Sequence, residues 1–148
     1  MAMGIILDVL LGLPHLAASP WNLVGTGLLG FGLFLEVWST FVLWKHGSGT
    51  PNPVDPPKRL VTEGPYRRSR NPLYLARISI LLGSSGILAS PGILAVALAL
   101  VLGLHFVLLP KEEKRIQLRF GAEYVNYKQR VPRWFSIRSL SGSQGKTP

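Results

Sequence analysis

Long stretches of apolar residues are the feature that most constrains the fold of this chain. Residues 21–44 form a run of 24 with a single charge, Glu36. At about 1.5 Å per residue, a helix of that length crosses a hydrocarbon core of roughly 30 Å. Residues 73–90 and 92–109 form two further runs of 18, separated by Pro91, which is typical of a turn. We expect three transmembrane helices, of which the second and third form a tight hairpin.

The fold class that follows is an all-α, polytopic membrane protein with one domain spanning residues 1–148. With 47% hydrophobic and only 16% charged residues, the chain is too apolar for an ordinary soluble domain. Residues 4–18 form another apolar segment, which carries Asp8 and Pro14 and is short for a span. It remains open whether this segment lies at the interface, crosses partway or forms a fourth transmembrane helix.

Positive charge is confined to particular segments. The 16 Lys and Arg outnumber 7 Asp and Glu, and no basic residue precedes Lys45. Basic loops beside apolar runs are typical of the cytoplasmic side, so we expect a cell-membrane protein whose segment 110–135 is cytoplasmic. The segregation argues against nucleic acid as a partner and favours membrane lipids. The absence of cysteine excludes thiolate chemistry, and oligomeric state is not indicated.

The first polar cluster lies in the sequence LVTEGPYRRSRNPLYL, residues 60–75. Asn71 suits a helix N-cap and Pro72 the first helical position, so the second span is expected to begin there. Arg67, Arg68 and Arg70 come just before this N-terminus, whose free N–H groups already favour an anion. The alternative is that these arginines only set the membrane orientation.

The second cluster follows Pro110, in KEEKRIQLRFGAEYVNYKQRV. An amphipathic helix is expected over 111–120, with Gly121 as its C-terminal cap. Glu112 and Glu113 emerge directly from the third span, at the level of the arginines, although acidic residues are also ordinary in a first helical turn. His105 lies seven residues before Glu112, and the two share a face if the helix continues through the proline. Residues 139–148 are expected to be disordered.

GPYRRSRNPLY together with HFVLLPKEEKRIQLRFGAEYVNYKQRV resembles the integral-membrane methyltransferases of the isoprenylcysteine carboxyl methyltransferase and phospholipid methyltransferase type. The resemblance covers residues 60–134. It implies S-adenosylmethionine as cofactor, bound between the hairpin and the C-terminal helix, and a lipophilic acceptor that enters from the bilayer. The acceptor would be an isoprenylcysteine-type carboxylate or a lipid headgroup.

The resemblance also assigns roles to residues of this chain. Arg70 or Arg67 would hold the carboxylate of the cofactor, and Glu112 or Glu113 its ammonium group. Tyr66, Tyr74 or Tyr124 would contact its adenine, and His105 would be a further cofactor contact. The catalytic set would be Arg70, Asn71, Glu112 and Glu113, with no metal ligands. Many family members have His where this chain has Asn71, and because Asn does not titrate near neutrality, cofactor positioning replaces proton transfer there.

Two other functions fit the same features: an NADPH-dependent membrane reductase of the sterol or steroid reductase type, and a non-catalytic membrane subunit. Two charges lie within the apolar runs. For Arg77, five residues inside the second span, we expect snorkelling to the interface rather than pairing with Glu36.

Overall fold

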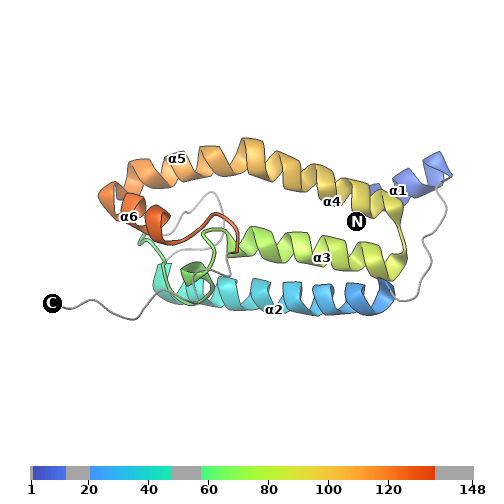
Figure 1. Cartoon of the computed structure of the whole chain (residues 1–148), viewed down its shortest axis with the longest axis horizontal. Coiled ribbons are helices and arrows are strands. Elements are labelled where there is room, and N and C mark those ends of the chain that lie inside the picture. The colour runs from blue at the N-terminus through green and yellow to red at the C-terminus, as the bar shows by residue number, and fades with distance from the viewer. Residues whose placement is uncertain (1, 13–20, 48–57, 136–148) are drawn as a thin grey trace.

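The computed structural model describes residues 2–12, 21–47 and 58–135, and every regular element in these ranges is helical. Three long rods lie side by side (Figure 1). The elements of the rods are α2 (Trp21–Gly47), α3 (Pro72–Leu88) and the succession α4 (Pro91–Gly103), η2 (Leu104–Leu108) and α5 (Leu109–Phe120). The shorter elements are α1 (Ala2–Leu11), the 3-10 turn η1 (Gly64–Arg67) and α6 (Ala122–Arg130). The all-helical prediction is confirmed for the described residues.

Two helices are long and apolar enough to cross a membrane, by length and composition alone: Asn22–Gly47 and the continuous helix Pro91–Phe120. The second of the three expected spans is shorter, because α3 has 17 residues and ends at Leu88 instead of residue 90. Of the N-terminal segment predicted over 4–18, residues 4–11 belong to the 10-residue helix α1. Residues 13–18 and the tail predicted to be disordered, 139–148, lie outside the described residues.

The hairpin turn was predicted correctly at Pro91, and α1 is anchored to it. Ala89 adopts a left-handed conformation with φ 48°, and Ser90 caps α4 by accepting a hydrogen bond from the Ile93 amide at 3.1 Å. Asp8 of α1 accepts hydrogen bonds from the Ser90 hydroxyl and from the Gly92 amide, the latter at 2.7 Å. The carboxylate therefore fixes α1 at the N-terminus of α4, where the helix dipole favours a negative charge.

Glycines allow α2 and α3 to touch backbone to backbone. A methyl group at Gly83 would come within 2.5 Å of the Leu29 amide nitrogen, and one at Gly25 within 2.7 Å of the Gly83 carbonyl oxygen. Gly32 meets the Ala76 carbonyl in the same way. A side chain at any of these three glycines would force the two helices apart, and small residues that allow such close approach are typical of helix pairs in membranes.

The third rod continues through Pro110 by means of a wider helical turn. Proline has no N–H to donate and its ring clashes with the carbonyl four residues earlier. The helix relieves this conflict in the π-helical turn η2, where the Leu109 amide reaches the Leu104 carbonyl, five residues back. The amphipathic helix expected over 111–120 therefore begins at Leu109, and Gly121, with φ 52°, ends it as expected.

Candidate functional site

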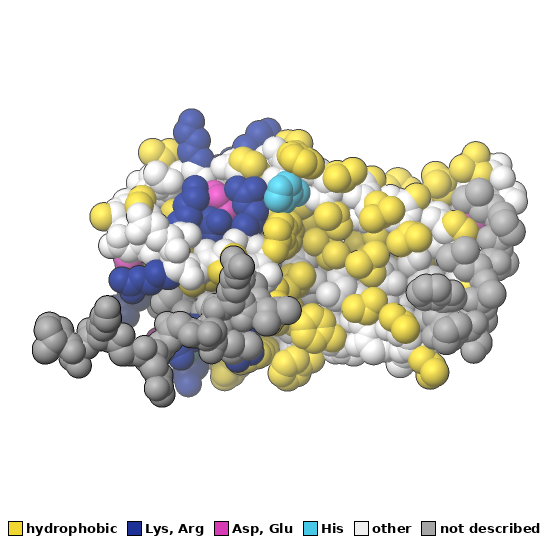
Figure 2. Space-filling view, viewed as in Figure 1, with side chains coloured by type: hydrophobic (Ala, Val, Ile, Leu, Met, Phe, Trp, Pro, Cys, Tyr) yellow, Lys and Arg dark blue, Asp and Glu magenta, His cyan; other side chains and the backbone are white. Residues whose placement is uncertain are grey.

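The two clusters singled out in the sequence meet at one end of the molecule, where Lys and Arg side chains gather while hydrophobic side chains cover the remaining length (Figure 2). Residues 131–135, which we call the strap, return from α6 to this end. The Arg70 amide donates to the Pro132 carbonyl at 3.0 Å. The Ser69 hydroxyl and the Asn71 side-chain amide both donate to the Arg133 carbonyl, at 3.3 and 3.2 Å. The strap is thereby hydrogen-bonded to the segment that precedes α3.

Glu113 is the electrostatic centre of the site. Its carboxylate is contacted by Arg70 Nη1 at 2.9 Å, by Arg133 Nε and Nη2 at 3.0 and 3.1 Å, and by Lys128 Nζ at 3.7 Å. The side chains of Glu113 and Arg70 are only 7% and 9% exposed. Paired arginines strongly favour the ionised carboxylate. The cluster joins α5, α6, the strap and the segment before α3.

Arg70 retains hydrogen-bonding capacity that the described residues do not use. Its Nε and Nη1 atoms are buried and form no aligned hydrogen bond within the described ranges, since the 2.9 Å contact of Nη1 with Glu113 is an ion pair without hydrogen-bond geometry. Buried guanidinium donors left unmatched are costly. An anion bound beside Arg70 would satisfy them.

Glu112 belongs to a second polar chain that crosses the three rods. The Tyr74 hydroxyl donates to Glu112 Oε1 at 2.7 Å, and the Arg77 guanidinium lies 6.0 Å from the centre of the Tyr74 ring. Arg77 Nε in turn donates to Glu36 Oε1 at 3.3 Å. The expectation that Arg77 snorkels rather than pairs is therefore wrong, because the close packing of α2 on α3 brings Glu36 within its reach.

Two of the three tyrosines expected to contact adenine are buried in protein contacts. Tyr66 packs in an apolar cluster with Val42, Leu43 and Val61. Tyr124 packs with Tyr127 and Val131, and burial raises the pKa of its hydroxyl, an effect that nearby Arg70 opposes. The Tyr127 hydroxyl donates to the Tyr66 carbonyl at 2.7 Å and joins the two clusters. Their assignment to adenine stays a prediction.

The other predicted residues take different positions. Arg67 is exposed, so the structure places it at the surface of the site. Asn71 occupies the N-cap position of α3, but its side chain forms no capping bond and is directed to the strap instead. His105 lies in the π-turn η2 and is half-buried.

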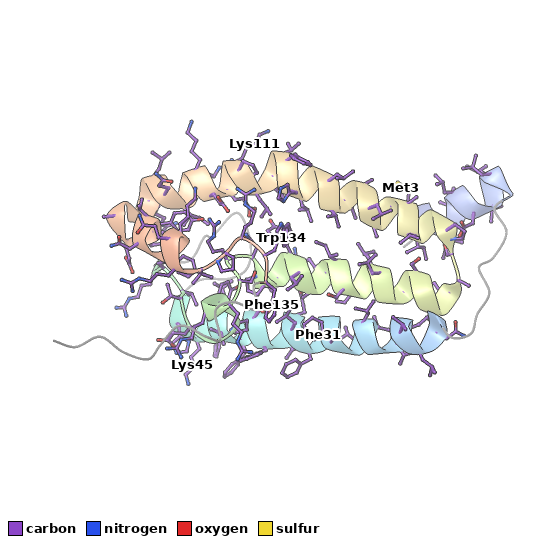
Figure 3. All side chains as sticks on the ribbon, in the orientation of Figure 1. Met3, Phe31, Lys45, Lys111, Trp134 and Phe135 are labelled. Carbon is purple, nitrogen blue, oxygen red and sulfur yellow. The ribbon has the colours of Figure 1, made fainter. Side chains whose placement is uncertain are left out.

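Arg133 and Trp134 were missed as site residues. The Trp134 indole Nε1 donates to His105 Nδ1 at 3.0 Å, and the two rings lie edge to edge with 17° between their planes. In Figure 3, Trp134 lies between the third rod and α3. The available signal was a basic and an aromatic residue just after the tyrosine-bearing segment, but no helical spacing indicates that such residues fold back. Within the described residues, no group of three or more His, Asp or Glu side chains is placed to hold a metal ion.

Comparison with known proteins identifies the relatives of this chain. The family model described as phospholipid methyltransferase matches residues 21–123. The chain is 40% identical to protein-S-isoprenylcysteine O-methyltransferase B of Arabidopsis thaliana over 75 residues, which are 50% of this chain and 38% of that protein. It is 35% identical to the cobalt-zinc-cadmium resistance protein CzcN of Cupriavidus metallidurans over 81 residues, 55% of this chain and 37% of that protein. These alignments cover less than two-fifths of either relative. No solved structure matches.

Proposed function

We propose that this chain, which belongs to the phospholipid methyltransferase family, transfers a methyl group from S-adenosylmethionine to a lipophilic acceptor in the membrane. The observation that carries the proposal is the buried Arg70 guanidinium, which lies beside Glu113 in the region that the family model matches and retains unused donors. An arginine in this state fits the carboxylate of an amino-acid-like cofactor.

The residues of the site fit the remaining charges of the cofactor. Glu112 accepts a hydrogen bond from Tyr74 through Oε1, and we assign the ammonium group to its other carboxylate oxygen. Glu113 is already surrounded by Arg70, Arg133 and Lys128, so its role is to hold Arg70 in place. Tyr74 is half-buried and is the tyrosine we assign to the adenine contact.

When bound, S-adenosylmethionine supplies a methyl group activated by its sulfonium, so the protein has mainly to align the acceptor and exclude water. An acceptor that is already ionised, such as a carboxylate, requires no general base, whereas an amine must first lose a proton. An isoprenylcysteine-type carboxylate and a lipid headgroup are the two acceptor classes we propose. Either would reach the site along the apolar surface of the rods.

We further propose that α2, α3 and the third rod all cross the cell membrane, with the site on the cytoplasmic side. α3, with 17 residues, is near the lower limit for a span. The concentration of Lys and Arg at the site end supports the orientation, because cytoplasmic ends carry the excess of basic residues (Figure 2).

Binding of S-adenosylmethionine and of NADPH to the detergent-purified protein tests the assignment. We expect the wild-type protein to bind S-adenosylmethionine with a Kd in the micromolar range, and Arg70→Lys and Glu112→Gln to weaken binding at least about tenfold through loss of a charge-assisted contact. Arg68→Lys is the matched control, because Arg68 is exposed and only two residues from Arg70.

Two results would contradict parts of this proposal. Tight NADPH binding without binding of S-adenosylmethionine would replace the methyltransferase by a reductase. Equal affinity in wild type, Arg70→Lys and Glu112→Gln would retain the cofactor but remove it from the site described above.

A further inference from the structure

The position of His105 is determined by two features, the π-turn that contains it and the side chain of Trp134. It belongs to the π-turn η2, which interrupts the third rod one turn before Pro110. Wide turns of this kind often occur at functional sites. Trp134, from the strap, lies edge to edge with the imidazole, with 17° between the ring planes, and donates to its Nδ1 atom at 3.0 Å.

The direction of this hydrogen bond decides which nitrogen of His105 carries the proton. An indole N–H is a donor only, so His105 Nδ1 has to accept and therefore bears a lone pair. A neutral imidazole carries its single proton on the other nitrogen, Nε2. The ring of His105 therefore presents an N–H, and not a lone pair, at its remaining nitrogen. Within the described residues, His105 Nε2 has no hydrogen-bond partner.

The strap holds Trp134 firmly enough to impose this choice. Its neighbour Arg133 forms a two-point ion pair with Glu113, and the Arg133 carbonyl receives bonds from Ser69 and Asn71. The indole thus reaches His105 from a backbone that is tied both to α5 and to the segment before α3. The two ring planes are only 17° from parallel, so the indole N–H lies close to the plane of the imidazole, where the Nδ1 lone pair is.

We propose that Trp134 is a positioning residue that holds His105 in the Nε2–H form, so that His105 donates a hydrogen bond to an oxygen of the methyl acceptor and does not act as a general base. The tautomer is independent of the activity, whereas the role toward the acceptor rests on the proposed methyltransferase function. A donor at this position suits an acceptor group that carries oxygen lone pairs or a negative charge, and it cannot deprotonate an ammonium group.

The tautomer is testable without substrate or cofactor. In the full chain labelled with ¹⁵N-histidine in detergent, the nitrogen chemical shifts distinguish a protonated from an unprotonated ring nitrogen, and loss of a signal in His105→Gln assigns it. We expect unprotonated Nδ1 and protonated Nε2 in the wild type. Trp134→Phe keeps an aromatic ring in the strap but removes the donor, and should shift His105 toward the other tautomer.

Trp44→Phe is the control, since Trp44 lies on α2 and is 68% exposed. It should leave the His105 spectrum unchanged. A protonated Nδ1 in the wild-type protein, or identical His105 shifts in the wild type and Trp134→Phe, would overturn the role of Trp134.

The role toward the acceptor is tested by two substitutions of His105. Gln keeps an N–H near the position of Nε2 but is not a base at neutral pH, whereas Leu keeps neither property. With a carboxylate-bearing prenyl thioether as acceptor, we expect His105→Gln to keep kcat within about threefold of wild type and His105→Leu to lose at least tenfold in kcat/KM. Equal, large losses of kcat in both variants would indicate a base and overturn the donor role.

Cofactor binding separates this inference from the proposed function. Failure of the wild-type protein to bind S-adenosylmethionine would refute the methyltransferase proposal, and the NMR experiment would still decide whether Trp134 sets the tautomer.

Discussion

At the scale of single residues, the sequence identified most of the charged groups but not their partners. It predicted that the arginines before α3 and the paired glutamates after Pro110 lie at the same depth along the helices. In the structure, Arg70 Nη1 lies 2.9 Å from Glu113 Oε1. It treated Glu112 and Glu113 as equivalent, although only Glu113 is enclosed by basic groups while Glu112 bonds to Tyr74. Residue types and spacing indicate where charges lie along a helix, but a partner such as Arg133 depends on where the chain folds back.

The first prediction at this scale concerns the stability that Glu113 provides. Glu113→Gln keeps the size of the side chain but leaves the buried Arg70 guanidinium without its counter-charge. Removing one partner of a buried ion pair costs about 3 kcal/mol. Thermal unfolding of the purified protein in detergent, followed by circular dichroism, should show a clear fall in Tm.

The exposed Glu123 of α6 supplies a control of the same residue type. Glu123→Gln should unfold at the wild-type temperature. If Glu113→Gln were as stable as Glu123→Gln, the Glu113 cluster would not contribute to holding the strap and α6 in place.

At the scale of helices, apolar runs and turn residues predicted the rods well and their ends less well. Pro72, Pro91 and Gly121 mark element boundaries as expected, because each restricts or requires a particular backbone conformation. Pro110 does not end its helix, since a π-turn accommodates it. The wrong expectation for Arg77 has a similar origin. Whether Arg77 reaches Glu36 depends on how closely α2 approaches α3, and the apolar sequence of either helix alone does not give that distance.

The glycine contact between α2 and α3 yields a matched pair of substitutions. Gly83→Ala places a methyl group within 2.5 Å of the Leu29 backbone and should destabilise the protein by roughly 1–3 kcal/mol through forced separation of the helices. Gly27→Ala meets no atom within 4 Å and should be neutral or slightly stabilising, since Ala favours helix over Gly. Denaturation in mixed detergent micelles compares the two. Equal stability of both variants would mean that this contact is not tight in the folded protein.

At the scale of the whole molecule, the distribution of charge and hydrophobicity predicted the division between an apolar length and a basic end (Figure 2). What it could not predict is that the strap packs against the segment before α3, because residues 131–135, although mostly apolar, are too few to show a periodicity that indicates a docking position. The anchoring of α1 through Asp8 could not be predicted either, because a single acidic residue in an apolar segment does not indicate which distant residue it will bind. The apolar runs thus predicted the order of the long helices, but they did not predict the contacts that the strap and α1 make with distant parts of the chain.

Orientation in the membrane is testable because the chain has no cysteine. A single cysteine introduced at Arg115, exposed on α5, should react with a membrane-impermeant thiol reagent only after cells are permeabilised. One introduced at Leu88, 44% exposed beside the hairpin turn, should react in intact cells. The cysteine-free parent controls for background labelling. The reverse pattern would place the basic end outside.

The π-turn η2, just before Pro110, also determines how many residues must separate His105 from Glu113. An i→i+5 turn takes up one residue more than an α-helical turn, so the eight positions from His105 to Glu113 advance the helix by about as much as seven would, close to two full turns. His105 and Glu113 thus come into phase and can both meet the strap. A relative with a regular helix here would need one residue fewer between its counterparts of these two side chains. A single-residue gap in an alignment at this point would mark a change of helix type that leaves the site intact.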